Sequence, residues 1–494
     1  MIQSIDYSAV AVPLILALTA GLVLLLDAFL PARPGGGRLL GVVALGGVAV
    51  ALAVLVAQAV RGGERRTFCV PPSLGSAASC SFVLDRFTLV FMALVLAAGV
   101  VVVLLSMAET SGGRVPVGEW YFLLLGTLTG AVLLAASRDL IMLVVSLELV
   151  SLPVFALTAM RRYDGRASEA ALKLFLVSVV STAIMLFGVS LLYGVTGSVH
   201  LDRIAAFYAS GQSAAPAGVG QGVTTVAIVL VLAGFGFKVA AVPFHFWAAD
   251  VYQGAPIPVA ALLSVISKAA GFAGLVLILT TALASQAAVW APVVAVIAAL
   301  TMTAGNVLAM RQRHAVRLLA WSSVAQSGYI LAPLAAFAGV PRDAVGASVA
   351  YLAFYAAMNL VAFGVVMLVS RARERNDLDD YQGLAFHSPV AALSLAFSLI
   401  CLAGLPPGLA GLFAKVVVFR AIVDGGLGWL AVVMAVNTVI GLYYYIAWTA
   451  RLFTPLSTGT HRSGSAPVAV AVGLAVIVTL VFSVAPQVVL SAVG

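Results

Sequence analysis

The four lysines of this 494-residue chain, Lys173, Lys238, Lys268 and Lys415, all lie inside long apolar segments. Every arginine except Arg420 instead lies in a loop between such segments or at the edge of one. A guanidinium group stays charged in proteins, whereas the pKa of a buried amine shifts readily. Burial lowers the pKa of a lysine, and a nearby carboxylate raises it again. The four lysines are therefore candidates for taking up and releasing protons near neutral pH.

One carboxylate, Glu148 in MLVVSLELVSLPVF, lies near the middle of an apolar segment. A lone charge at the centre of a bilayer costs at least ~2.5–3.5 kcal/mol on insertion scales, so buried charges of this kind need a compensating role. For each residue the alternative is a structural ion pair or a side chain that reaches back to the interface. That alternative suits Lys173 best, because Lys173 lies only about one turn into its segment.

His245 in AVPFHFW has the side chain that titrates nearest physiological pH, so it is a candidate relay between the lysines; a hydrogen-bonded packing role is the alternative. The uncharged side chains that could hold water between the lysines are Ser264, Ser322, Gln326 and Asn359. Serines in membrane helices often bond only to a backbone carbonyl or a neighbouring helix, so each of these carries little weight alone. The three cysteines are too few and too scattered for an iron–sulfur or zinc site, and no metal is expected.

The composition requires a membrane environment for these residues. The chain is 63% hydrophobic and 9% charged, against about 45–50% and about 25% in soluble proteins. Its net charge of +8 comes from arginines in short loops, which indicates topology rather than nucleic-acid binding. A bilayer core of ~30 Å needs about 20 apolar residues per helix. We predict an all-α polytopic membrane protein with about fourteen transmembrane helices, at residues 8–30, 38–60, 84–107, 119–136, 138–160, 169–195, 223–250, 257–283, 288–309, 316–339, 345–370, 388–424, 428–451 and 467–491.

The seventh and twelfth predicted helices contain prolines flanked by glycines, in AVPFHFW and LAGLPPGLAG. Proline removes a backbone donor, so both helices should break or kink. The two breaks match if residues 119–283 and 288–452 form two inverted five-helix repeats, with residues 1–110 and 453–494 adding three helices and one helix. Broken helices at matching positions of inverted repeats indicate a transport site near the membrane midplane; two ordinary proline kinks are the alternative.

The loop charges predict the orientation of the chain. Counting the first loop as odd, the odd loops hold fourteen arginines, from Arg33 to Arg462, and the even loops and flanks hold seven. The excess of positive charge marks the cytoplasmic side, so both termini should face outward. Cys69 and Cys80 then lie in an oxidising compartment, where they either form a disulfide or remain free.

Several segments resemble a known family, the antiporter-like membrane subunits of proton-pumping NADH:quinone oxidoreductase, respiratory complex I. They are VSLELVSLPVFAL, ALKLFLVSVVSTAIMLFGVSLLYGVTGS, GFKVAAVPFHFWAADVYQGAPIPV, SKAAGF, RLLAWSSVAQSGYIL and LAGLPPGLAGLFAKVVVF. Within the family the pattern is closest to the N-type subunits, because the chain ends soon after the last helix and the twelfth helix carries Lys415. The resemblance implies a fourteen-helix fold with two inverted repeats.

The resemblance also implies roles. Glu148 and Lys238 become an ion pair that tunes the central proton site, Lys268 the connecting lysine and Lys415 the terminal lysine. Lys173 and His245 match positions whose roles are less defined. Gln326 is a departure, because relatives often have a histidine there, and glutamine cannot titrate.

The function expected from the resemblance is that of a non-redox subunit of a translocase in the bacterial plasma membrane. Quinone reduction elsewhere in the complex would drive proton translocation. The partners implied are the lipid bilayer and M-like, K-like and J-like membrane subunits. The resemblance assigns FMN, iron–sulfur clusters and quinone to partner subunits and no cofactor to this chain. A multi-subunit cation/proton antiporter shares these motifs and is the alternative; a membrane scaffold without transport is the third reading.

Overall fold

A computed structural model describes residues 5–29, 36–70, 79–113, 115–161, 163–210, 219–373, 375–455 and 465–493. Arg33, Arg114, Arg162 and Arg462, four of the arginines behind the predicted orientation, lie outside these residues. The long helices of the first part are α1 (Ala11–Phe29), α2 (Gly36–Arg61), α3 (Arg86–Thr110), α4 (Val117–Ala136), α5 (Leu140–Ala159), α6 (Gly165–Thr196), α8 (Val219–Lys238) and the pair α10 (Ile257–Leu262) and α11 (Lys268–Leu277). Those of the second part are α12 (Ala287–Ala309), α13 (Ala315–Leu331), α14 (Pro341–Ser370), α16 (Pro389–Ala403), α17 (Leu409–Asp424), α18 (Gly428–Leu452) and α19 (Ala466–Val484).

Short elements complete the described chain. They are β1 (Arg65–Cys69), β2 (Cys80–Leu84), α7 (Leu201–Ala209), α9 (Ala248–Gly254), α15 (Leu384–His387), α20 (Gln487–Val493), the π-helical turns η2 (Leu263–Ser267) and η3 (Ile278–Ala282), and the 3₁₀ turns η4 (Ala284–Gln286), η5 (Ala332–Ala336) and η6 (Leu378–Tyr381).

The predicted helical membrane fold is confirmed. Within the described residues, 12 helices are long and apolar enough to cross a membrane. Two further predicted spans are less regular: α13 has 17 residues and continues into the 3₁₀ turn η5, and the twelfth span is divided between α16 and α17. The total of fourteen therefore stays a prediction.

Both predicted breaks are present. The seventh span stops being helical after Lys238, the last residue of α8, and resumes at Ala248 in α9. The twelfth span is interrupted between Ala403 and Leu409. Pro243 lies in the first interruption and Pro406 and Pro407 in the second. Each break thus places the end of a helix, with its unpaired backbone groups, inside the bundle.

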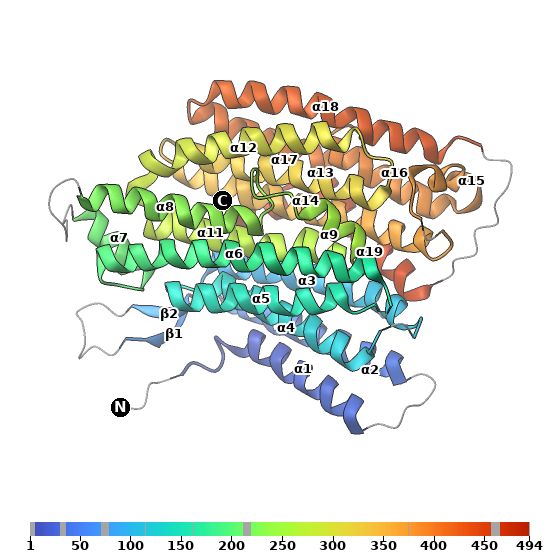
Figure 1. Ribbon diagram of the computed structural model, residues 1–494, viewed down its shortest axis with the longest axis horizontal. Coiled ribbons are helices and arrows are strands. Elements are labelled where there is room, and N and C mark those ends of the chain that lie inside the picture. Colours follow the sequence, from blue (N-terminus) through green and yellow to red (C-terminus); the bar gives the residue numbers. More distant parts are fainter. Residues whose placement is uncertain are drawn as a thin grey trace.

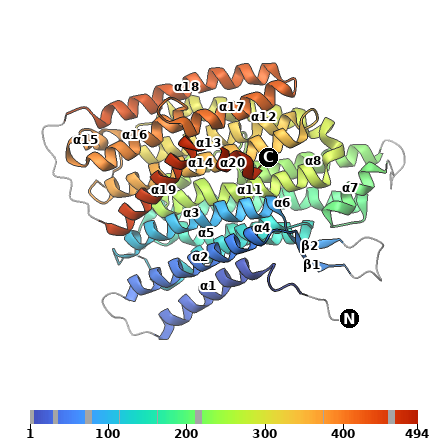
Figure 2. The same cartoon turned by 180° about the vertical axis from the view of Figure 1, so that it is seen from behind.

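The long helices lie roughly side by side, with α1 at one edge of the bundle and α18 at the opposite edge (Figure 1). α3 and α19 pack against each other although they lie far apart in the sequence, as seen from behind (Figure 2). The hairpin β1–β2 and α7 lie at one end of the helices, and α15 lies at the other (Figure 1). Since the helices cross the membrane, these two ends mark its two sides.

The packing partners of the two halves correspond. α4 packs on α5, as α12 packs on α13; α6 packs on α8 and α9, as α14 packs on α16 and α17. Asp139 and His200 form an isolated antiparallel β-bridge. In this bridge the backbone N–H of Leu140 donates to the carbonyl of Val199, and that of Leu201 donates to the carbonyl of Arg138. The equivalent β-bridge joins His314 and Asp377 where α13 begins. Here the backbone N–H of Ala315 donates to the carbonyl of Asn376, and that of Leu378 donates to the carbonyl of Arg313.

These two bridges support the inverted repeat proposed from the sequence. The first lies between the starts of α5 and α7, and the second between the starts of α13 and η6. The helices α7 and α15, which follow these segments, are at opposite ends of the bundle (Figure 1). Asp139 and His314 are also equivalent as N-caps. The side chain of each accepts a hydrogen bond from the backbone N–H three residues later and so caps its helix.

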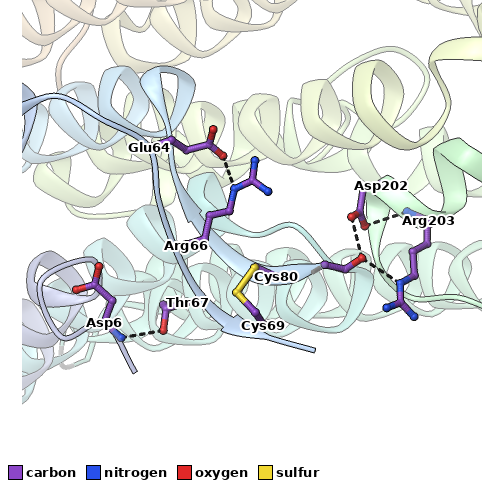
Figure 3. Close-up of a disulfide and its surroundings, with 9 residues drawn as sticks. Asp6, Glu64, Arg66, Thr67, Cys69, Cys80, Asp202 and Arg203 are labelled. Carbon is purple, nitrogen blue, oxygen red and sulfur yellow. Dashed lines mark hydrogen bonds and ion pairs between the residues drawn. A yellow bond between two sulfur atoms is a disulfide. The ribbon is translucent and has the colours of Figure 1, made fainter. Parts of the chain in front are cut away.

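The loop with the two cysteines forms an antiparallel hairpin, which the sequence had indicated only as a loop. Cys69 and Cys80 are cross-strand partners and are joined by a disulfide (Figure 3). Ser79, next to the disulfide, donates a hydrogen bond of 2.8 Å to Asp202 of α7 and accepts one of 3.0 Å from Arg203. The hairpin is thereby attached to the amphipathic helix α7 at this end of the bundle.

Candidate functional site

Glu148 and Lys238 face each other across α5 and α8. The Nζ atom of Lys238 lies 3.9 Å from Oε1 of Glu148, which is an ion pair too long for a hydrogen bond. Thr182 of α6 donates a hydrogen bond of 2.8 Å to the same Glu148 oxygen. The side chain of Glu148 is 27% exposed and that of Lys238 only 7%. The carboxylate is thus at the rim of the site and the ammonium inside it.

Two serines hold the Lys238 ammonium. Ser151, one turn after Glu148 on α5, accepts a hydrogen bond of 2.6 Å from Nζ, and Ser178, one turn before Thr182 on α6, accepts one of 3.0 Å. The sequence analysis missed all three hydroxyl residues. Their spacing was the available signal, because residues three and four apart share a helix face.

A cavity of about 20 Å³ lies beside Lys238, lined among others by Ser151, Ser178, Trp247 and Ser267. That volume is enough for one water molecule, for which a polar lining and ~10–15 Å³ suffice. Ser267 immediately precedes Lys268 in the chain. The cavity therefore extends from the Lys238 ammonium toward the segment that carries the next lysine.

Lys268 begins α11 directly after the π-helical turn η2. Its side chain is buried, and Nζ donates hydrogen bonds of 2.5 Å to the carbonyl of Ser323 and 2.7 Å to the hydroxyl of Ser327. Within the described residues no carboxylate lies within ion-pair distance of this ammonium. Neutral oxygens on α13 therefore provide its direct stabilisation. Single π turns inside membrane and soluble helices are frequent at functional sites.

Lys415 lies on α17, close to the second break. Its Nζ donates a hydrogen bond of 2.5 Å to the carbonyl of Ala403, a group released by the end of α16, and lies 5.7 Å from the centroid of the Tyr329 ring. Gly404 has a φ of +80°, and a Cβ atom there would lie 2.9 Å from Cδ of Lys415. Glycine is therefore needed both for the turn and for the space that Lys415 occupies. A cavity of about 410 Å³ adjoins Lys415 between α17 and α18.

His245 lies in the non-helical segment between α8 and α9. Its ring makes an edge contact with Trp321 of α13, with centroids 5.5 Å apart, and its Nδ1 atom is buried without a hydrogen-bond partner among the described residues. The described contacts do not join it to Lys238 or Lys268. Both the relay role and the packing role stay open.

Lys173 differs from the other three lysines. Its side chain is 44% exposed and pairs with Glu169 at 2.7 Å and with Asp250 at 3.2 Å. Asp250 of α9 also accepts a hydrogen bond of 2.7 Å from Arg317 of α13. Lys173, Glu169 and Asp250 line a cavity of about 160 Å³ together with Arg166 and Gln253 of neighbouring turns. The geometry matches the ion-pair alternative for Lys173.

The four residues predicted to hold water make direct hydrogen bonds to other side chains, and their role in holding water stays a prediction. Asn359 of α14 donates a hydrogen bond of 2.8 Å to Ser264, one turn before Lys268. Ser322 is 2.5 Å from the Tyr445 hydroxyl, and Gln326 donates to the same hydroxyl at 3.2 Å. Sequence reasoning missed the tyrosines that bind these residues. Within the described chain no group of three or more His, Cys, Asp or Glu side chains is placed to hold a metal ion.

The comparisons with known proteins agree with this architecture. Residues 137–441 match the family described as NADH:quinone oxidoreductase/Mrp antiporter, TM. NADH-quinone oxidoreductase subunit N 2 of Streptomyces griseus subsp. griseus is 54% identical over 476 residues, which cover 94% of this chain and 87% of that protein. NADH-quinone oxidoreductase subunit N of Salinispora tropica is 46% identical over 463 residues, which cover 92% of this chain and 86% of that protein.

Solved structures show the same fold. A chain of respiratory complex I from Thermus thermophilus with bound aureothin is 31% identical, with a TM-score of 0.77 over 98% of this chain and 100% of that one. A chain of the Mrp complex from Dietzia sp. is 22% identical, with a TM-score of 0.81 over 99% of this chain and 96% of that one. At that identity the Mrp likeness is one of fold alone.

Proposed function

The chain belongs to the NADH-quinone oxidoreductase subunit N family, and from this premise we propose that it moves protons across the bacterial plasma membrane through a buried relay. The relay comprises Glu148, Lys238, Lys268 and Lys415. His245 is its candidate connection between Lys238 and Lys268, and Lys173 its candidate contact with the cytoplasmic side. In this proposal the chain acts as a non-redox subunit of a proton-translocating NADH:quinone oxidoreductase.

One observation carries the proposal: three of the four lysines are buried inside the helical bundle and rest on hydroxyl or carbonyl oxygens. Lys238 is 7% exposed, Lys268 1% and Lys415 9%. Burying ammonium groups of this kind is expensive, and stability alone is a weak reason for keeping them. A row of amines that lose and regain protons gives such burial a function.

The Glu148–Lys238 pair is the element that can be switched. Two unit charges about 4 Å apart attract each other by about 4 kcal/mol at an effective dielectric constant of ~20. Both partners already have other hydrogen bonds, Glu148 from Thr182 and Lys238 to Ser151. Moving the carboxylate away would remove the electrostatic support for the charged amine, so Lys238 would release its proton toward Lys268. The proton would pass on to Lys415, and a proton from the cytoplasm would reset Lys238.

The energy for this cycle must come from partner subunits. Moving one charge against 100 mV needs about 2.3 kcal/mol. The relay groups of this chain only bind and pass on protons, so quinone reduction in partner subunits, with their FMN and iron–sulfur clusters, is the proposed drive. The proposed neighbours are the M-like, K-like and J-like membrane subunits, and both termini are proposed to face outward.

The test is proton pumping by the intact complex in sealed vesicles, measured together with quinone reduction. For Lys238→Ala and Glu148→Ala we expect the number of protons moved per electron pair to fall, with the larger loss for Lys238→Ala. Arg66→Gln is the control, because Arg66 is a cation of the β1–β2 hairpin with a 56% exposed side chain outside the relay. Equal pumping in all three variants would contradict the proposal. Purification of the chain with antiporter subunits alone would instead favour the cation/proton antiporter.

A further inference from the structure

A cluster of buried tyrosines lies between Lys268 and Lys415, contributed by α13, α14 and α18. Its centre is Gln326 of α13. Tyr351 donates a hydrogen bond of 2.6 Å to Oε1 of Gln326, and Nε2 of Gln326 donates one of 3.2 Å to the hydroxyl of Tyr445. All three side chains are buried. The amide is thus held at both ends and fixes the direction in which the Tyr351 hydroxyl points.

One edge of the cluster reaches the Lys268 site. Lys268 is hydrogen-bonded to the backbone carbonyl of Ser323, and the hydroxyl of Ser323 lies 2.7 Å from that of Tyr355. Tyr355 and Tyr351 are four residues apart on α14, so their side chains lie on the same face of that helix. The two hydroxyl groups therefore succeed each other along α14, from the Lys268 site to Gln326.

The other edge reaches Lys415. The rings of Tyr351 and Tyr329 are stacked with centroids 5.8 Å apart, and Nζ of Lys415 lies 5.7 Å from the centroid of the Tyr329 ring. An ammonium group over an aromatic face is attracted by the ring quadrupole. Lys268 and Lys415 are thus connected through contiguous side chains, although their ammonium groups share no direct contact.

The chemistry of these groups decides which of them can carry a proton. A tyrosine hydroxyl can accept a hydrogen bond and donate one at the same time, whereas a glutamine amide neither gains nor loses a proton at neutral pH. The Gln326 oxygen to which Tyr351 donates at rest cannot take up the proton, so the acceptor beyond Tyr351 would be a water molecule and finally the neutral amine of Lys415. A hydroxyl that receives a proton on its lone pair passes its own proton to the next acceptor. Its protonation is unchanged after the transfer, and no oxidant or reductant is needed. Gln326 can orient such a step but cannot perform it.

We propose that the hydroxyl groups of Tyr355 and Tyr351 carry the proton from the Lys268 site toward Lys415, and that Gln326, anchored by Tyr445, is the residue that positions Tyr351. This inference rests on the proposed function and adds named groups to its second step. The spaces between the hydroxyl groups would be crossed by water.

The first experiment compares Tyr351→Phe and Tyr355→Phe with Tyr121→Phe in the intact complex in vesicles. Tyr121 is a buried tyrosine of α4 whose hydroxyl lies 3.4 Å from that of Thr110, outside the cluster, so it serves as the matched control. We expect each of the two α14 variants to slow proton transfer through the chain by about tenfold or more, as the loss of a positioned proton-transfer group does. We also expect the solvent deuterium isotope effect on pumping to change in these two variants only. Equal behaviour of all three would overturn the inference.

The second experiment tests the positioning role with Gln326→Leu and Gln326→His. Leucine removes both hydrogen bonds, so we expect a loss similar to that in Tyr351→Phe. Histidine keeps an acceptor and a donor and can also titrate, so we expect pumping to be retained with a pH profile that differs from that of the parent. A pH profile identical to that of the parent would overturn the inference, even if a phenylalanine variant failed to assemble.

The same vesicles distinguish this inference from the proposed function. If replacing Lys268 impairs pumping but the two α14 variants match Tyr121→Phe, the relay stands and the proposed role of the two tyrosines is wrong. If replacing Lys268 has no effect, the proposed function itself is wrong.

Discussion

The Glu148–Lys238 site and the region around Lys268 and Lys415 hold their ammonium groups in different ways. Lys238 has a carboxylate 3.9 Å away, and that carboxylate is 27% exposed. Lys268 and Lys415 are bonded to carbonyl and hydroxyl oxygens, with no carboxylate within ion-pair distance in the described chain. A charge pair responds strongly to a field or to a movement of one partner, whereas neutral oxygens respond weakly. In the proposed relay, this difference gives the first site the switching role and the second region the conducting role.

The largest effect that separates the two regions is expected from Lys268→Met. Methionine is similar in length and cannot carry a proton, so we expect pumping through the chain to fall by about tenfold or more. Because Lys268 has no carboxylate partner among the described residues, its removal leaves no buried unpaired charge. We therefore expect the complex to assemble with normal yield, which blue native electrophoresis would show. A low yield of assembled complex, with wild-type pumping by the fraction that does assemble, would contradict the distinction between the two regions.

The smallest expected effect is on the pH dependence of stability and involves the two β-bridges, Asp139–His200 and His314–Asp377. The acidic residue comes first in the chain in one bridge and second in the other. Burial lowers the pKa of His314 below its usual 6.5; Asp377 opposes the shift and Arg317 adds to it. The folded protein therefore prefers neutral His314, which caps α13 as an acceptor.

The sign of the pH dependence follows from this preference. Above pH 6.5 His314 is neutral in both the folded and the unfolded state. As the pH falls below 6.5 the unfolded state takes up the proton more readily, so stability decreases. His314→Asn keeps a capping side chain that does not titrate. Between pH 7 and 5.5 we expect the unfolding temperature to drop less in the variant than in the parent, by an amount of the order of 1 °C. An equal drop in the two proteins would show that His314 is not held neutral.

The sequence was sufficient to predict the helical membrane fold and the two helix breaks, because length, apolarity and proline act locally. It was also sufficient to select Glu148 and the buried lysines, because charged residues are rare in apolar segments. The contacts of Lys268 could not be predicted, because its partners on α13 are more than 50 residues away, and pairing at that distance depends on helix packing. The hairpin β1–β2 was missed, since its strands have five residues each and lie between long helices.

Tyr351 and Tyr445 were missed for a different reason. Tyrosine is common in helical cores, and nothing in the local sequence indicates whether its hydroxyl meets an amide or another aromatic ring. Gln326 was recognised as a departure from the family pattern, but its two partners lie on α14 and α18. Only the packing of these helices on α13 brings the three side chains together.

The most direct measurement of the central claim is the number of protons moved per electron pair by the intact complex in vesicles when Lys238, Lys268 and Lys415 are all replaced by methionine. The account predicts that the ratio falls while the remaining quinone reduction still proceeds, because the protons that this chain moves are no longer carried. A ratio equal to that of the parent complex, at matched assembly, would contradict the claim that these buried amines carry protons.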